Sequence, residues 1–229
     1  MKLRSRLLAA ACTLLVAPLA AHAALDAGNL KPIKLPEPQL DKPGTVMQAI
    51  KNRESLRDVD TSRDLSQADL SNILWAIDGV NRTEGSKRTA PTGFARLAKQ
   101  ASVVFVMLKD GVYRHDPETH TLLPLIAGDQ RKSLGDQAFV TGAPLNVMFA
   151  LDLDIIDAPG SRRDFEERFG WGNIEIGHKS MAGYLYCAVA GCSAVYRAGA
   201  ANNAFTDLMK KEFPRLRMVG GQTYGYEKK

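Results

Sequence analysis

Two arginines bracket a serine at Arg53, Ser55 and Arg57, directly after a short apolar helix expected over residues 45–53. Guanidinium groups four residues apart on an extended chain point to the same side and can hold a phosphate through paired hydrogen bonds. Ser55 would add a neutral donor between them. Cations also suit a helix C-terminus, where they complement the helix dipole and stay solvated, so spacing alone leaves both interpretations open.

Further short motifs follow along the chain. They are Leu-Ser-Gln-Ala-Asp-Leu at 65–70 leading into Ile-Leu-Trp-Ala at 73–76, Arg-Thr-Ala-Pro-Thr-Gly at 88–93, Gly-Val-Tyr-Arg-His-Asp-Pro at 111–117, Gly-His-Lys at 177–179 and Gln-Thr-Tyr-Gly-Tyr at 222–226. In this order they resemble the FMN-dependent nitroreductase family, which carries an early Arg-Arg-Ser-x-Arg signature, a Gly-His helix start and a Gln-Thr-Val-Gly-Tyr-Pro ending. The chain is most similar to the single-module, thiazoline-oxidase-like branch.

The resemblance implies an α+β fold of three layers, in which helices flank a central, mainly antiparallel sheet. It also implies an intertwined homodimer with FMN at each subunit interface. Arg53, Ser55 and Arg57 would then hold the phosphate and ribityl chain of the cofactor.

The isoalloxazine ring would be lined by Arg88, Pro91 and Thr92. Residues 194–199 fall where the family presents backbone N–H groups to flavin N5, and this segment contains Tyr196 and Arg197. Arg197 is unusual there. It could approach the N1/O2 edge or the phosphate, or it could pair with a carboxylate, and these alternatives stay open.

The implied activity is FMN-dependent oxidation or reduction of a small-molecule substrate by hydride transfer through N5, with the protein supplying binding and orientation. No side chain is required as an acid or base, so we assign no catalytic residue. The alternative is a degenerate family member that binds a flavin or another small ligand without turnover, or acts as a structural partner. Glu54, Tyr224 and Glu227 stand where the family carries arginine, valine and proline, and a carboxylate at 54 opposes a phosphate.

Residues 1–23 have the pattern of a secretory signal peptide. Lys2, Arg4 and Arg6 precede an apolar run over 7–20, and Ala-His-Ala at 21–23 is a small-x-small cleavage site. The run is too short to span a membrane, so we expect a periplasmic or secreted protein without membrane insertion. Lipidation of Cys12 is the alternative. An exported protein has no evident supply of nicotinamide cofactor, which favours a flavoenzyme that oxidises its substrate.

Charge and cysteine content exclude some classes of partner. Removing the three signal-peptide cations from the formal net charge of +5 leaves +2, which does not indicate a nucleic-acid partner. Cys187 and Cys192 are five residues apart, so a disulfide requires the helix to end between them, at Gly191, and two buried thiols are the alternative. The histidines show no metal-ligand spacing with these cysteines, so no metal is expected.

The elements that must position these residues follow from periodicity. Residues 24–44 are proline-rich and predict an extended arm, which often crosses a partner subunit. By resemblance, residues 45–229 would form the nitroreductase-like domain. We expect helices from Ser66 to Gly79 and from Ile174 onward, an antiparallel meander over 102–108, 112–116 and 121–125, and a buried central strand over 143–151. Gly-Trp-Gly at 170–172 suggests a mobile lid. By resemblance, a last strand over 216–223 joins the sheet of the other subunit.

Overall fold

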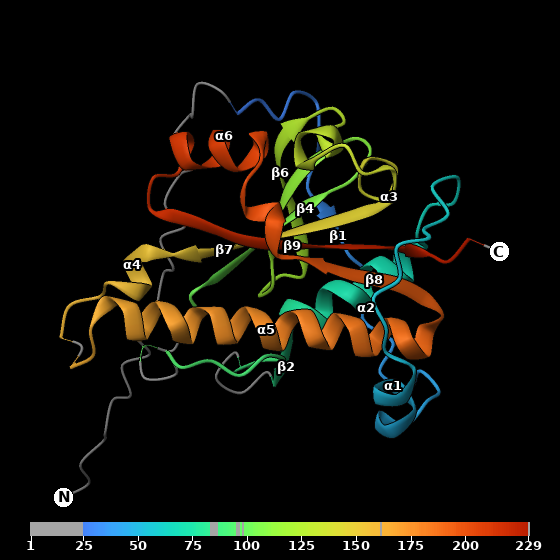
Figure 1. The fold of residues 1–229 in the computed structure, drawn as a ribbon, viewed down its shortest axis with the longest axis horizontal. Helices are drawn as coiled ribbons and strands as arrows, with labels where there is room; N and C mark the ends of the chain where they lie inside the picture. The colour runs from blue at the N-terminus through green and yellow to red at the C-terminus, as the bar shows by residue number, and fades with distance from the viewer. Residues whose placement is uncertain (1–24, 83–86, 95–96, 98, 161, 229) are drawn as a thin grey trace, which may run out of the picture.

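A seven-stranded sheet lies between two helical layers (Figure 1) in the computed structural model, which describes all residues except 1–24, 83–86, 95–96, 98, 161 and 229. The expected signal peptide therefore falls outside the described residues. The strand order is β1-β6-β5-β4-β7-β9-β8, and every neighbouring pair is antiparallel. This confirms the three-layer α+β fold with a mainly antiparallel sheet.

The strands include both the expected meander and the expected central strand. Their bounds are β1 Ile33–Lys34, β4 Ser102–Met107, β5 Gly111–Asp116, β6 Thr121–Ala127, β7 Leu145–Asp152, β8 Cys192–Arg197 and β9 Leu216–Tyr226, with a separate hairpin of β2 Val80–Arg82 and β3 Lys87–Arg88. Side chains alternate across β7, so that Val147 and Phe149 face the core under α2 and α5 while Met148 and Ala150 face the core under α6. Each face of the sheet thus has its own apolar core.

Apart from α3, the described α-helices begin where a capping side chain accepts from a backbone N–H of the first turn. Their bounds are α1 Val46–Asn52, α2 Gln67–Asp78, α3 Ala138–Thr141, α4 Leu153–Ile156, α5 Phe165–Ala190 and α6 Ala204–Glu212, with 3-10 turns η2 Arg131–Leu134 and η3 Ala198–Ala201. Thr45 and Gln48 form a capping box on α1, and Ser66 caps α2 as expected. None of the described helices is long and apolar enough to cross a bilayer.

The prediction of a lid at 170–172 is wrong, and the helix expected from Ile174 begins earlier, at Phe165. Asp164 caps α5, which then continues without a break to Ala190 and crosses the sheet as one long rod (Figure 1). Interior glycines disfavour a helix by about 1 kcal/mol each, so sequence periodicity breaks at 170–172. Packing overrides this local preference, because a Cβ at Gly172 would lie 2.8 Å from Leu151 of β7.

The two terminal segments pair within their own chain. The arm is extended as expected, but β1 pairs with β6 through Ile33 and Leu122, and Leu35 is buried. The last strand, β9, lies between β7 and β8 in the same sheet, so the expectation that it joins the sheet of another subunit is wrong. Long antiparallel pairing on both sides leaves β9 no free edge with which to reach a partner.

A disulfide joins Cys187 at the end of α5 to Cys192 at the start of β8. Gly191 ends the helix in the left-handed region, with φ 73°, and this turn brings the two Cα atoms within 4.5 Å. Of the two alternatives weighed from the sequence, the disulfide is therefore the correct one. It fixes the angle between α5 and β8, the two elements that carry Tyr184 and Tyr196.

Candidate functional site

The segment with Arg53, Ser55 and Arg57 lies extended after α1. Arg53 is the C-cap of the helix, with φ −62° and ψ 120°, and the Leu56 N–H donates to Ala194 of β8 at 3.2 Å. Arg57 lies five residues beyond the last residue of α1, outside the range over which a helix dipole acts. The dipole interpretation can therefore apply to Arg53 but not to Arg57.

Tyr184 of α5 connects this segment to β8. Its hydroxyl lies 2.8 Å from the hydroxyl of Ser55 and accepts a hydrogen bond of 2.7 Å from the backbone N–H of Tyr196. The Arg53 guanidinium lies 5.4 Å from the centroid of the Tyr184 ring. Three of the expected site residues thus converge on one side chain, a role that no spacing pattern in the sequence indicated.

Pro91 and Thr92 lie farther toward the start of α5. The Thr92 hydroxyl donates to the carboxylate of Glu175 at 2.5 Å, and the Ser102 N–H donates to the same carboxylate at 2.9 Å. The Ala101 N–H and the Ser102 hydroxyl complete the set of donors. Glu175 is only 1% exposed, so this buried acceptor locks the Thr92 loop and the start of β4 onto α5.

A cavity of about 340 Å³ opens beside this loop. It is lined by Pro91, Thr92, Gly93, Trp171, Ile174, Glu175 and His178. A Cβ at Gly93 would lie 3.0 Å from the Cβ of Trp171, which is tighter than an ordinary side-chain contact, so glycine lets the backbone lie close against Trp171.

Arg88 is turned toward the protein interior. Its guanidinium donates to the buried carboxylate of Asp78 at 3.0 Å and lies 3.5 Å from Glu118. Asp78 also binds Lys179 of α5, which is fully buried, and His115 of β5 at 3.0 Å. Arg88 thus forms an ion pair in this subunit, and its expected place beside a flavin ring stays a prediction.

The Asp78 cluster extends through a second histidine. Burial raises the pKa of the Asp78 carboxyl, but the charge of Lys179 and the hydrogen bond from His115 outweigh it and lower the pKa to about 2. His115 contacts His120 at 3.3 Å, and His120 lies 2.8 Å from the Ser71 hydroxyl. Burial, followed by the charges of His115 and Lys34, lowers the pKa of His120 to about 4.

Tyr196 and Arg197 lie next to each other on β8 and therefore point to opposite faces of the sheet. The Tyr196 ring lies 6.5 Å from Phe149, on the face covered by α5. Arg197 donates to Thr223 at 3.2 Å and to the Leu134 carbonyl at 3.5 Å, and burial lowers its pKa. Of the alternatives for Arg197, the described residues show neither a carboxylate partner nor a side chain directed at Ser55.

One subunit does not bring all the expected site residues together. The Arg53 group contacts α5 at Tyr184 and the Thr92 group contacts it at Glu175, a separation of about 13 Å along the helix axis. Both contacts are made by buried side chains of the same helix, since Glu175 is 1% and Tyr184 is 9% exposed. The described residues contain no group of three or more His, Cys, Asp or Glu side chains that could hold a metal ion.

Comparison with solved structures decides the family. A protein from Ralstonia eutropha JMP134 described as a nitroreductase is 31% identical, and the match covers 87% of this chain and 91% of that one with a TM-score of 0.76. The chain belongs to the nitroreductase family. No family sequence model and no curated protein matches it.

Two solved structures of lower identity share the fold. A Desulfovibrio desulfuricans nitroreductase in complex with FMN is 18% identical over 82% of this chain and 88% of that one, with a TM-score of 0.55. The NADPH:FMN oxidoreductase of Vibrio harveyi, complexed with NAD⁺, is also 18% identical, over 80% and 69% of the two chains with a TM-score of 0.55.

Replacing Glu175 with Gln should destabilise this nitroreductase-family protein by about 2–4 kcal/mol, because an amide N–H₂ would face buried donors that now share a charged acceptor. Urea unfolding of the purified protein measures this change. Glu166→Gln, on an exposed position of the same helix, is the matched control and should change the free energy of unfolding by less than about 0.5 kcal/mol. Equal effects of the two substitutions would contradict the anchoring role of Glu175.

The thermal stability should fall as the pH decreases from 6.5 to 5, because the lowered pKa of His120 means that the unfolded chain binds its proton more readily than the folded one. The contribution of His120 to the free energy of unfolding is complete above its unfolded pKa of about 6.5. It is lost as the pH falls toward its folded pKa of about 4. A charged His120 would face His115 and Lys34. Melting curves across this range measure the effect.

His120→Asn should flatten that pH dependence. Asparagine tolerates the left-handed backbone of this position, where φ is 47°, and it cannot be protonated in this range. A His120→Asn variant whose melting temperature falls as steeply as that of the wild type would show that another group is responsible.

Proposed function

We propose that this nitroreductase-family protein is an FMN-dependent oxidoreductase that acts on a small-molecule substrate. The observation that carries the proposal is the pair of arginines flanking Ser55 on an extended segment. Neither Arg53 nor Arg57 forms an ion pair with any described residue, and Arg57 is exposed. Two uncommitted guanidinium forks suit a phosphate group that has several acceptor oxygens.

The residues present fit an FMN phosphate with one adjustment. The Ser55 hydroxyl is hydrogen-bonded to the Tyr184 hydroxyl, and the Tyr184 oxygen also accepts from the N–H of Tyr196. Phosphate binding by Ser55 would exchange that contact for a charge-assisted one, which is the stronger type. Glu54 is exposed, so water screens its repulsion of the phosphate.

Bound FMN would supply the two-electron redox chemistry. This chain's own residues would bind, orient and shield it: Arg53, Ser55 and Arg57 at the phosphate, and Pro91 and Thr92 beside the ring. The buried carboxylate of Glu175 would hold Thr92 in place. The Desulfovibrio desulfuricans relative is a complex with FMN, which supports this choice of cofactor.

We also propose that the working form is a homodimer. Large apolar side chains are exposed on two adjacent helices, namely Val46, Met47 and Ile50 on α1 and Ile174 and Met181 on α5. Met47 is 73% exposed and Met181 48%, and a water-exposed patch of this kind is typical of a protein interface. On α5 the positions 174, 177, 178 and 181 share one face of the helix.

Export to the periplasm remains our proposal, and the disulfide between Cys187 and Cys192 supports it, because such bonds persist in oxidising compartments. We also propose that the protein belongs to the thiazoline-oxidase-like branch and oxidises its substrate, because an exported enzyme has no evident supply of nicotinamide cofactor. Intact-mass measurement of secreted protein tests export, and a chain that retains residues 1–23 would refute it.

A ligand-binding protein without turnover is the second candidate. The observation that favours it is the saturation of Ser55 and of the Tyr196 N–H by Tyr184, together with Glu54. Purified protein that never acquires a flavin spectrum under saturating FMN would support this candidate and end the enzyme proposal.

Replacing both Arg53 and Arg57 with Gln should weaken FMN binding by about 3–6 kcal/mol, since each charge-assisted hydrogen bond is worth roughly 1.5–3 kcal/mol. Stability should change far less. Flavin fluorescence titration and melting curves on both proteins measure the two effects.

Lys51→Gln is the matched control for this titration, because it removes one charge from the last turn of α1 without touching the extended segment. It should leave FMN affinity unchanged. If the double variant loses only about 0.3–1 kcal/mol of stability and binds FMN as well as the wild type, neither arginine holds the phosphate and Arg53 serves the helix dipole instead.

Met181→Glu should convert the proposed dimer into a folded monomer, because two-fold symmetry would bring two new carboxylates into a desolvated interface. Sedimentation at micromolar concentration should give twice the chain mass for the wild type and for the control Lys210→Glu on the exposed face of α6. A wild type that sediments as a stable monomer would refute the dimer.

A further inference from the structure

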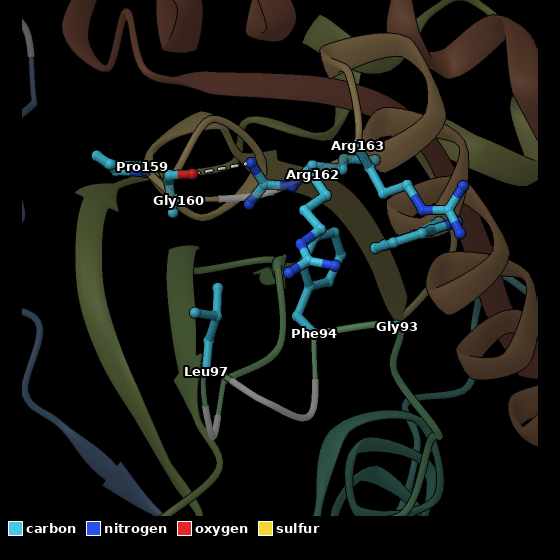
Figure 2. A pocket seen from close by; sticks show the side chains of 10 residues that line it. Gly93, Phe94, Leu97, Pro159, Gly160, Arg162 and Arg163 are labelled. Carbon is cyan, nitrogen blue, oxygen red and sulfur yellow. Dashed lines mark hydrogen bonds between the residues drawn. The ribbon is translucent and has the colours of Figure 1, made fainter.

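A second cavity, of about 810 Å³, lies beside the loop that carries Thr92 (Figure 2). It is lined by Gly93, Phe94, Leu97, Ala158, Pro159, Gly160, Arg162, Arg163, Arg168 and Trp171. Gly93 and Trp171 also line the smaller cavity next to Pro91, so the two cavities share a wall. The volume lies within the range of small-molecule sites in proteins.

The wall of this cavity is basic, with three arginines and no acidic residue among the described residues that line it. Arg168 is committed to the fold: it is 6% exposed and donates to the carbonyls of Ala158 at 3.0 Å and Ile155 at 2.7 Å. Arg163 pairs with Glu167 at 3.3 Å. These two arginines are therefore already neutralised or hydrogen-bonded by the protein.

Arg162 differs from both neighbours. It forms no hydrogen bond or ion pair with the described residues of the chain. Figure 2 shows its side chain pointing into the cavity toward Phe94. One guanidinium fork is thus available, and a single fork matches the two oxygens of one carboxylate.

The opposite wall is aromatic. Phe94 and Trp171 lie edge to face with ring centroids 6.0 Å apart and an interplanar angle of 61°. A buried phenyl ring and an indole give a planar, conjugated ligand two surfaces to pack against. An aliphatic ligand would lose the favourable ring–ring geometry.

We propose that this cavity binds the substrate as a planar conjugated carboxylate, with its carboxylate on Arg162 and its body against Phe94 and Trp171. The inference rests on the proposed function. Gly93 and Trp171 line both cavities, so a cofactor beside Pro91 and Thr92 would lie next to this ligand. Among the described lining residues only Arg162 has a free fork, so a phosphate, which calls for more donors, fits less well.

Isothermal titration of FMN-loaded protein with 2-naphthoate and with its uncharged analogue 2-naphthamide tests the charge requirement. The acid should bind about 10- to 100-fold more tightly than the amide, as a charge-assisted contact predicts. Arg162→Gln should abolish this preference. Arg163→Gln is the matched control, because it removes the same charge one residue away from a guanidinium that is already paired, and it should keep the preference within about twofold.

Equal binding of acid and amide by the wild type would overturn the proposal, and so would a preference that survives in Arg162→Gln. Loss of the preference in both variants would also overturn it, because long-range charge would then account for the effect. If the protein takes up no FMN, the proposed function fails. The same titration on flavin-free protein still decides whether Arg162 makes this cavity a carboxylate site.

Discussion

The buried carboxylate of Asp78 is the constraint on which the arrangement of layers depends. It lies at the end of α2 and accepts from Lys179 of α5, His115 of β5 and Arg88 of β3. A charge in a dry interior is tolerated only when it is paired and hydrogen-bonded, and loss of one partner from a buried ion pair costs about 3–5 kcal/mol. The four elements are therefore held in one register, since any sliding of α5 against α2 would separate Lys179 from Asp78.

This register places the rest of the site along α5. Lys179 points inward, and the same helix carries Glu175, which anchors the Thr92 loop, and Tyr184, which anchors the Ser55 segment. The disulfide between Cys187 and Cys192 then fixes β8 relative to the end of the helix. A helix that also served as a lid could not position both groups, so the continuity of α5 through its glycines is a condition for the site.

Sequence reasoning identified the fold because the family motifs, the alternating apolar strands and the helix caps all follow local rules. Thr45, Ser66 and the meander were recoverable in that way. It failed where tertiary contacts override local preference, as at 170–172, where packing of Gly172 against β7 outweighs the cost of glycine in a helix. It also failed for β9, whose pairing partners lie far away in the chain and leave no local signature.

The charged cluster could have been suspected from the sequence. Asp78 continues the apolar stripe of α2 after Leu70, Leu74 and Ile77, and Lys179 follows Ile176 on the inner face of α5. A charged residue at a core position of a helix requires a buried partner, and two such residues on different helices are candidates for each other. Spacing could not pair them, because no local rule states which helices are adjacent.

The separation of the two site groups gives the proposed dimer a specific geometric role. The apolar stripe on the outer face of α5 runs from Ile174 to Met181, and its midpoint falls between Glu175 and Tyr184. A two-fold axis through that midpoint, with the two copies of α5 antiparallel, would place the Thr92 group of one copy beside the Arg53 group of the other. The distance of about 13 Å that one helix imposes would then fall to about 6 Å along the helix axis, by symmetry rather than by any movement within the subunit.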